Sequence, residues 1–185
     1  MLDSIDLLIL DVDGVLSDGR IVYDSRGAET KAFHVLDGQA VKYWRRVGHE
    51  VAILSGRASR TIRLRARELG VRAVYMNAKD KLPVFEKILT HFGRHADRAC
   101  YIGDELVDLP VMARAGFAVA PAGAVDEVKR VAHYVTRHPG GAGAVREAIQ
   151  LILEYQDRWA DATARYRDRL PPGLPARRRP WRDAP

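Results

Sequence analysis

The sequence predicts an α/β fold, a Rossmann-like parallel sheet with helices on both faces. Short apolar segments alternate with amphipathic stretches along most of the 185 residues, which is typical of parallel strands joined by helices. We expect strands at Ile5–Leu10, Val51–Leu54, Ala73–Tyr75, Cys100–Ile102, Phe117–Val119 and Tyr134–Val135. Helices are expected near Gln39–Val47, Ser59–Leu69, Lys81–His91, Leu106–Ala115, Val125–Val131 and Ala144–Tyr155.

Two segments depart from this alternation. Arg20–Tyr23 and Thr30–Phe33 are rich in β-forming residues, and turn-forming residues separate them, so we expect a small hairpin flap at about residues 18–37. We expect one domain over residues 1–155. Residues 156–185 are expected to form a helical extension and then an Arg- and Pro-rich tail that is extended or disordered.

Composition narrows the class of protein. The net charge is +6, but residues 156–185 hold eight Arg and four Asp, so the rest of the chain carries only +2. This distribution argues against a nucleic-acid-binding body. No apolar run approaches the ~20 residues of a membrane span, no secretion signal is evident, and the single Cys100 allows no disulfide within the chain. We therefore expect a cytoplasmic protein with no nucleic-acid or membrane partner.

Two carboxylates, Asp11 and Asp13, follow the first predicted strand and precede Gly14. Ligands bind at the carboxyl ends of strands in open α/β sheets. One carboxylate can attack the phosphorus of a phosphate ester, while a second protonates the leaving oxygen and later activates water. Asp11 suits the nucleophile and Asp13 the general acid/base. A capped turn with Asp13 as the N-cap is the structural alternative.

Ser55 and Lys81 are candidate phosphate ligands. The second predicted strand runs into Ser55 and Gly56, where a hydroxyl and backbone N–H groups could hold phosphate oxygens. Lys81 begins a predicted helix, where the helix dipole disfavours a positive charge. A bound phosphate would explain its position. Ser55 could instead be a helix cap, Lys81 a solvated surface residue, and Lys79 the phosphate ligand in its place.

A third acidic group follows the strand that ends at Ile102. Asp104, Glu105 and Asp108 lie within five residues, and Mg²⁺ binds one or two carboxylates together with phosphate and water. Asp104 would join Asp11 and the backbone carbonyl of Asp13 as a metal ligand, with Glu105 and Asp108 behind them orienting waters or Lys81. An acidic helix N-terminus is the alternative. Together, these motifs predict a Mg²⁺-dependent site for phosphoryl transfer.

This order of motifs resembles the haloacid dehalogenase superfamily of aspartate-nucleophile phosphatases. Four parts resemble the 3-deoxy-D-manno-octulosonate 8-phosphate phosphatase family in particular: Asp11 to Gly19, Lys31 to Phe33 with Asp37-Gly38, Ser55-Gly56-Arg57 with Arg65, and Gly103 to Met112. Residues 132–147 resemble its C-terminal signature, and the resemblance covers about residues 5–160.

The resemblance implies a fold without a large cap domain. It also implies a homotetramer in which the hairpin and a neighbour's C-terminal segment close the site, so the tail could pack on another subunit. The implied substrate is a phosphorylated eight-carbon keto sugar acid of lipopolysaccharide precursor synthesis. By this resemblance Asp11, Asp13 and Asp104 surround Mg²⁺, and Lys81 and Ser55 hold the phosphate. The implied substrate-binding residues are His34, Asp37, Gly38, Lys42, Gly56, Arg57 and Arg65.

Arg57 bears on the choice of substrate. Similar phosphatases for nine-carbon sialic-type acids tend to have glutamate there, which favours the octulosonate, and arginine suits a carboxylate. Surface charge on a helix is the alternative for Arg57 and Arg65. The chain departs from the family pattern at His34, Leu36, Lys42 and Glu105. The alternative functions are a phosphatase of a nine-carbon keto sugar acid (KDN or sialic acid 9-phosphate) and a non-catalytic binding protein on the same fold.

Overall fold

Six parallel strands form the central sheet of the computed structural model, which describes residues 2–169. The strands lie in the order β5-β4-β1-β6-β7-β8, and the predicted α/β class is confirmed. Their bounds are β1 Leu7–Leu10, β4 Glu50–Leu54, β5 Ala73–Tyr75, β6 Ala99–Ile102, β7 Phe117–Ala120 and β8 Tyr134–Val135. Every strand lies within two residues of its expected position.

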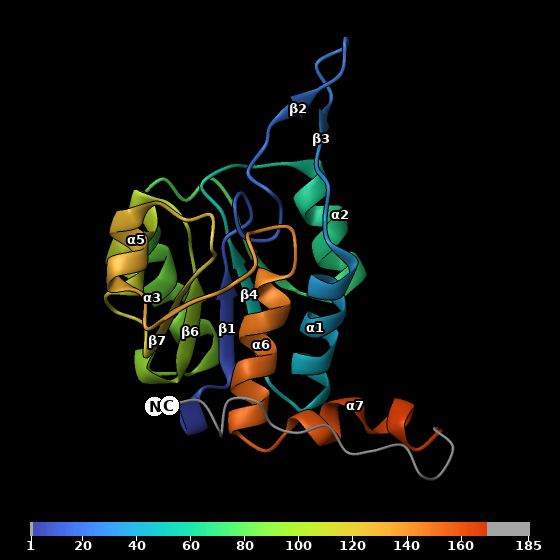
Figure 1. Ribbon diagram of the computed structural model, residues 1–185. Helices are drawn as coiled ribbons and strands as arrows, with labels where there is room; N and C mark the ends of the chain where they lie inside the picture. Colours follow the sequence, from blue (N-terminus) through green and yellow to red (C-terminus); the bar gives the residue numbers. More distant parts are fainter. Residues whose placement is uncertain (1, 170–185) are drawn as a thin grey trace.

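Helices cover both faces of the sheet (Figure 1). One face packs α1 (Val35–Arg46), α2 (Arg60–Leu69) and α6 (Ala144–Tyr155), and the other packs α3 (Lys81–Phe92), α4 (Leu109–Met112) and α5 (Asp126–Val131). Short 3₁₀ helices occupy Leu2–Ser4, Ala96–Arg98 and Leu106–Asp108. Successive side chains of a strand point to opposite faces. Leu8 and Leu10 of β1 therefore enter one core cluster, and Leu7 and Ile9 enter the other.

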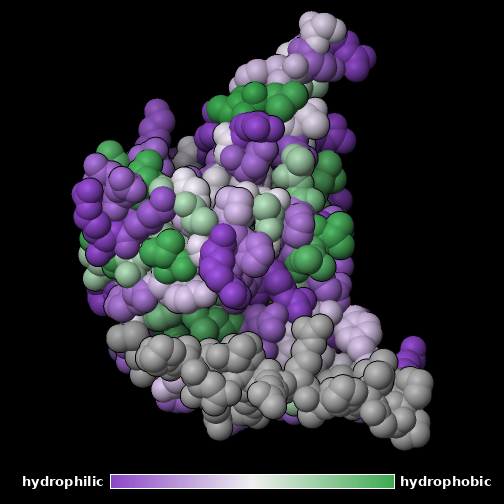
Figure 2. Space-filling view, viewed as in Figure 1, coloured by the Kyte–Doolittle hydropathy of each residue, from purple (hydrophilic) through white to green (hydrophobic). Residues whose placement is uncertain are grey.

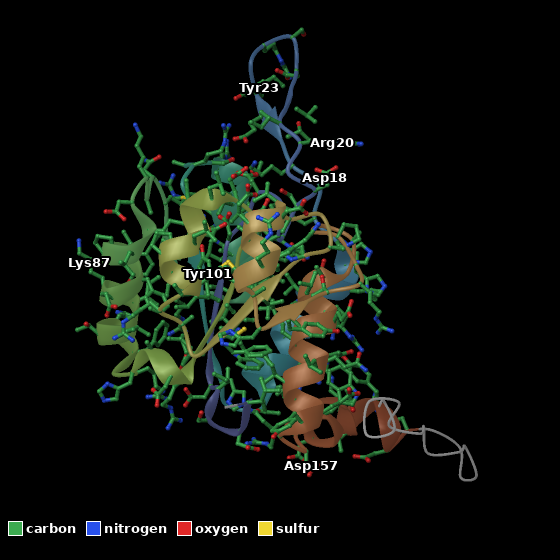
Figure 3. The ribbon with its side chains drawn as sticks, turned by 60° about the vertical axis from the view of Figure 1, so that its left-hand side comes forward. Asp18, Arg20, Tyr23, Lys87, Tyr101 and Asp157 are labelled. Atoms are coloured by element: carbon green, nitrogen blue, oxygen red, sulfur yellow. The ribbon has the colours of Figure 1, made fainter. Side chains whose placement is uncertain are left out.

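A two-stranded hairpin, β2 (Val22–Tyr23) and β3 (Glu29–Thr30), projects beyond the carboxyl ends of the sheet strands (Figure 1). Its strands are shorter than expected, at the ends nearest the sheet. Asp24 closes the turn over residues 24–28, where its carboxylate accepts hydrogen bonds from the backbone N–H groups of Arg26 and Ala28. Figure 3 shows Asp18 and Arg20 at the root of this flap and Tyr23 further out. Hydrophobic surface lies on the hairpin (Figure 2), where Ile21, Val22 and Tyr23 are exposed.

Two helices differ from the expectation. Helix α1 begins four residues early and includes Gly38, a poor helix former. The guanidinium of Arg65 occupies the space beside this glycine, where a Cβ would lie 2.1 Å from Nη2. The expected helix over Leu106–Ala115 divides into a 3₁₀ turn and α4. Pro110, at the start of α4, lacks the N–H that a continuous helix would use there.

A further helix, α7 (Trp159–Arg167), crosses the end of the molecule opposite the flap (Figure 1). The guanidinium of Arg146 lies over the rings of Tyr43 and Trp159, which ties α7 to α1 and α6. The Arg- and Pro-rich tail, predicted to follow this helix, falls in residues 170–185 and lies outside the described residues. None of the helices between residues 2 and 169 is long and apolar enough to cross a membrane.

Candidate active site

The candidate active site lies where the order of the strands reverses. The chain leaves β1 toward β4 and β5, and later returns on the other side of β1 to form β6, β7 and β8. Such a reversal opens a crevice beyond the carboxyl ends of the two central strands. Asp11 follows β1 and Asp104 follows β6, and the backbone N–H of Asp11 donates to the carbonyl of Ile102 at 3.1 Å. The topology therefore brings these two acids together.

Lys81 connects the nucleophile candidate to a second buried acid. Its ammonium lies 3.0 Å from Asp11 Oδ2 and 2.6 Å from Asp108 Oδ1, and its side chain is 2% exposed. Burial lowers the pKa of Lys81, but the charges of Asp11 and Asp108 outweigh this and raise the pKa above its usual value. The first residue of α3 is thus a buried cation held in the site, not a solvated surface lysine.

Asp108 supports the site without being open to a ligand. Its Oδ1 accepts hydrogen bonds from Lys81 and from the hydroxyl of Tyr101, at 2.6 and 2.5 Å. Its Oδ2 accepts from the backbone N–H groups of Asp104 and Glu105, at 2.9 and 3.1 Å. With both oxygens taken, Asp108 fixes the loop after β6 and leaves the remaining acids to face the crevice.

Asp11 and Asp104 are the acids left to bind a cation. Carboxylate oxygens of Asp11, Asp104 and Asp108 lie within 4.8 Å of one another. Burial raises the pKa of Asp11 to about 6 against the opposing charge of Lys81. Burial, then repulsion by Asp11 and Asp108, raises the pKa of Asp104 to about 7. Asp104 Oδ1 is buried and accepts no hydrogen bond within residues 2–169.

Gly14 lets the Asp104 carboxylate approach the loop after β1. A Cβ on Gly14 would lie 1.9 Å from Asp104 Oδ2, and the backbone there has a φ of +82°. Glycine adopts this left-handed conformation without strain. The glycine after the Asp11-x-Asp13 pair is therefore required both by the turn and by the neighbouring acid.

Ser55 is buried at the end of β4, beside the loop that leads to Lys81. Its Oγ accepts a hydrogen bond from the backbone N–H of Arg57 at 3.2 Å, and its carbonyl accepts from Ala78 at 3.1 Å. A Cβ on Gly56 would lie 3.7 Å from the carbonyl oxygen of Ala78, an ordinary van der Waals contact. Ser55 thus caps the turn at 55–57, while α2 has its own cap in Ser59.

Asp13 faces the flap and not the buried cluster. The ammonium of Lys31 is hydrogen-bonded to Asp13 Oδ1 and lies 2.9 Å from Glu29 Oε1, with its side chain fully buried. Arg57 Nε lies 3.8 Å from Asp13 Oδ2, and Arg57 Nη2 lies 3.4 Å from Glu29 and 3.3 Å from the hydroxyl of Tyr23. Two cations therefore lie beside the acid/base candidate: Lys31 from the flap and Arg57 from the turn after β4.

Comparison with known proteins identifies the family. A family model described as haloacid dehalogenase-like hydrolase matches residues 23–116. The chain is 44% identical over 160 residues to the 3-deoxy-D-manno-octulosonate 8-phosphate phosphatase of Yersinia pestis, covering 86% of each protein. The chain belongs to the haloacid dehalogenase-like hydrolases.

Other relatives carry the same description. The 3-deoxy-D-manno-octulosonate 8-phosphate phosphatase of Escherichia coli K12 is 41% identical over 160 residues, 86% of this chain and 85% of that protein. The crystal structure of the Moraxella catarrhalis enzyme, in complex with a magnesium ion, a phosphate ion and a KDO molecule, matches with a TM-score of 0.87 at 38% identity. The match covers 89% of this chain and 95% of that one. The fold of this hydrolase is therefore that of solved phosphatases over nearly all described residues.

The other predicted substrate residues form a second group at the start of α1. The Asp37 carboxylate accepts hydrogen bonds from the backbone N–H groups of Gly143 and Arg146, at 3.1 and 2.7 Å, and so caps α6. Arg65 Nη2 donates to the carbonyl of His34 at 3.1 Å, beside Gly38. Lys42 is exposed on α1, about two turns beyond His34. The structure therefore brings His34, Gly38 and Arg65 together at the start of α1, with Asp37 next to them, whereas Lys42 lies further along the helix.

Three residues at the site received no role from the sequence. Lys31 and Glu29 form the link between flap and Asp13, and Tyr101 supports Asp108 from within the sheet (Figure 3). A charged pair next to a predicted turn looks like ordinary surface charge, and a Tyr in an apolar strand looks like core. The one available signal was the resemblance of the Lys31 segment to a family flap.

Proposed function

We propose that this hydrolase is a Mg²⁺-dependent phosphatase that converts 3-deoxy-D-manno-octulosonate 8-phosphate to the free sugar acid and inorganic phosphate, in lipopolysaccharide precursor synthesis. The observation that carries the proposal is the buried arrangement of Asp11, Lys81, Asp104 and Asp108 at the switch point of the sheet. The proposed substrate is supported by relatives that bear this name at 41–44% identity over 86% of the chain.

The acids of the site fit a magnesium ion. Mg²⁺ takes oxygen ligands, and Asp104 offers a buried oxygen that accepts no hydrogen bond within the described part of the chain. The raised pKa values of Asp11 and Asp104 mark negative charge that a cation would compensate. Asp11, Asp104 and the backbone carbonyl of Asp13 would hold the ion. When bound, it neutralises charge on the transferring phosphoryl group.

The side chains then divide the reaction between them. A carboxylate oxygen of Asp11 attacks phosphorus, the ester bond to the sugar oxygen breaks, and Asp13 gives that oxygen its proton. The product is an aspartyl phosphate on Asp11. In the second step Asp13 takes a proton from water, whose oxygen attacks phosphorus and releases phosphate, regenerating Asp11. Lys81 holds Asp11 in place and attracts the phosphate oxygens, and the backbone N–H groups and hydroxyl around Ser55 are the remaining donors.

Arg57 is the residue proposed to select an acidic sugar. It is partly exposed beside Asp13 and is turned toward the flap through Tyr23 and Glu29. A guanidinium at this position can pair bidentately with the carboxylate of a keto sugar acid. Gly56, His34, Lys42 and Arg65 are proposed to complete the substrate rim, and Asp37 to hold it in position.

Turnover of two substrates tests the proposal. We expect phosphate release from the eight-carbon acid 8-phosphate to exceed release from a nine-carbon keto acid 9-phosphate by at least about tenfold in kcat/KM, equivalent to ~1.4 kcal/mol. Arg57→Glu is expected to erase that preference, whereas Arg130→Glu, an equal charge change at an exposed site on α5, leaves it intact. Equal rates for both substrates in the unaltered protein would reject the octulosonate assignment. Full activity of Asp11→Asn would reject the nucleophile.

We further propose that the active form is a homotetramer assembled through the flap. Ile21, Val22 and Tyr23 are 47–59% exposed on a hairpin whose two-residue strands pair with no other strand of residues 2–169, and burial of such side chains favours association. Light scattering is expected to give a mass four times that of the 20.7 kDa chain. Val22→Asp is expected to lower the mass and to reduce activity. A monomeric, fully active wild type would refute the assembly.

A further inference from the structure

A pocket lined by four arginines lies beside the C-terminal half of α2. Its volume is about 460 Å³, and its walls include Arg45, Arg63, Arg67 and Arg72. The active site lies beyond the opposite end of the helix, since α2 begins just after the turn at Ser55–Arg57 and runs back toward the start of β5. The ten residues of α2 span ~15 Å, so the pocket is separate from the catalytic acids.

The pocket concentrates positive charge without acids to balance it. None of the four arginines forms an ion pair with an acidic side chain of residues 2–169. The one acid of α2, Glu68, pairs instead with Arg65 at 2.8 Å. Arg63 and Arg67 are four residues apart on one face of the helix, a spacing at which like charges destabilise a helix. A bound anion would relieve the repulsion between these two side chains.

The backbone holds part of this charge in place. Arg45 Nη1 donates to the carbonyl of Leu69 at 3.0 Å, and a Cβ on Gly70 would lie 2.3 Å from the same nitrogen. Gly70 ends α2 in a left-handed conformation, with a φ of +71°. The guanidinium of Arg45 is thus packed against the helix end. Ala66, Val71 and Val74 add apolar lining to the pocket, beside the exposed side chains of the other three arginines.

From this arrangement we propose a second binding site for a small molecule that carries two or more linked phosphate groups. Guanidinium groups bind phosphate oxygens in pairs, and four of them exceed what a single phosphate can engage. The volume lies in the range of small-ligand sites, and the apolar lining residues suit a ring or chain attached to the phosphates. A nucleic acid is disfavoured because the four arginines gather at one pocket and form no extended basic stripe, and the chain before residue 156 carries a net charge of only +2.

Calorimetry with inorganic pyrophosphate and ADP, in the presence of EDTA, tests this site in the full-length protein. The double variant Arg63→Gln/Arg67→Gln is expected to weaken binding of both probes by at least about tenfold, since each lost guanidinium removes charge-assisted hydrogen bonds. The matched control Lys87→Gln/Arg130→Gln removes two exposed charges from α3 and α5 and is expected to change binding less than twofold. Inorganic phosphate is expected to bind at least about tenfold more weakly than pyrophosphate.

The outcomes separate the alternatives. Equal affinity in the wild type and the pocket variant would overturn the proposal, and so would equal weakening in the control, which indicates unspecific charge. Tighter binding of a short RNA than of ADP, lost in the pocket variant, would replace the small molecule by nucleic acid. Arg72→Gln provides a second variant if the double variant fails to fold. Phosphatase kcat/KM is expected to be unchanged in the pocket variant, so this test is independent of the proposed substrate.

Discussion

Replacing Asp104 by asparagine is expected to stabilise the metal-free protein, by an amount that grows with pH. Burial and the charges of Asp11 and Asp108 raise the pKa of Asp104 to about 7, against an ordinary value of 3.8. A carboxyl group whose pKa is raised by folding lowers stability as pH increases above its unfolded value, until the folded group ionises. Its Oδ1 accepts no hydrogen bond within residues 2–169, so the substitution removes charge at little cost in hydrogen bonding.

The magnitude follows from the two pKa values. At 1.36 kcal/mol per unit, the free-energy penalty of Asp104 amounts to roughly 1.5 kcal/mol at pH 5 and about 4 kcal/mol at pH 7. The advantage of Asp104→Asn is therefore expected to grow by about 2 kcal/mol over this range. Magnesium should reverse the order, since the wild type gains free energy from binding the ion and the variant has lost a proposed ligand.

Urea unfolding at pH 5, 6 and 7, in EDTA and again in excess Mg²⁺, measures this difference. Asp126→Asn is the control, because this carboxylate is 77% exposed on α5 and lies 3.9 Å from Lys129; its effect is expected to stay within about 0.5 kcal/mol at every pH. A difference between Asp104→Asn and wild type that is independent of pH would refute the electrostatic argument. So would a variant that gains as much stability from Mg²⁺ as the wild type does.

Two further substitutions test buried charges in the same fold. Lys81→Met is expected to cost 3–5 kcal/mol of unfolding free energy at pH 7 and to abolish turnover, because it leaves Asp11 and Asp108 without their shared cation; stability and activity that survive would contradict its role. Glu147→Gln is expected to cost about 2 kcal/mol at pH 7. Hydrogen bonds from His138, Tyr134 and the loop 137–138 outweigh burial and hold the Glu147 pKa at about 2. The penalty should shrink in urea titrations as pH falls from 4.5 toward 2, and a constant penalty would exclude this cause.

The sheet was predictable because its signal is local. Each strand is an apolar run, and β1, buried on both faces, reads as four consecutive large apolar residues. The start of α1 was not predictable from the same kind of signal. Gly38 weakens any local helix pattern, and the guanidinium that fills the space beside it comes from Arg65, distant in sequence. Helix starts that depend on a tertiary contact leave no periodic trace in the sequence.

In the candidate site, too, some residues have a local signal in the sequence and others are explained only by tertiary contacts. Asp11, Lys81 and Asp104 were predictable because strand ends and a dipole-opposed lysine are visible in sequence, and the structure brings them together. Asp37 was assigned to the substrate from resemblance alone, and its carboxylate caps α6, more than a hundred residues away. Lys31 could not be assigned from its neighbours, because its partner Asp13 meets it only when the flap folds back over the loop after β1.

The two acids of the Asp11-x-Asp13 pair are consequently held by different parts of the molecule. Asp11 is fixed by Lys81 at the start of α3, within the packed body. Asp13 is fixed by Lys31, the residue that directly follows the hairpin. The two strands of this hairpin have only two residues each and could not be stable alone. The fully buried ammonium of Lys31, between Asp13 and Glu29, gives this short hairpin a defined attachment. Displacing the flap is therefore expected to alter the environment of Asp13, the proposed proton donor, while leaving Asp11, the proposed nucleophile, in place.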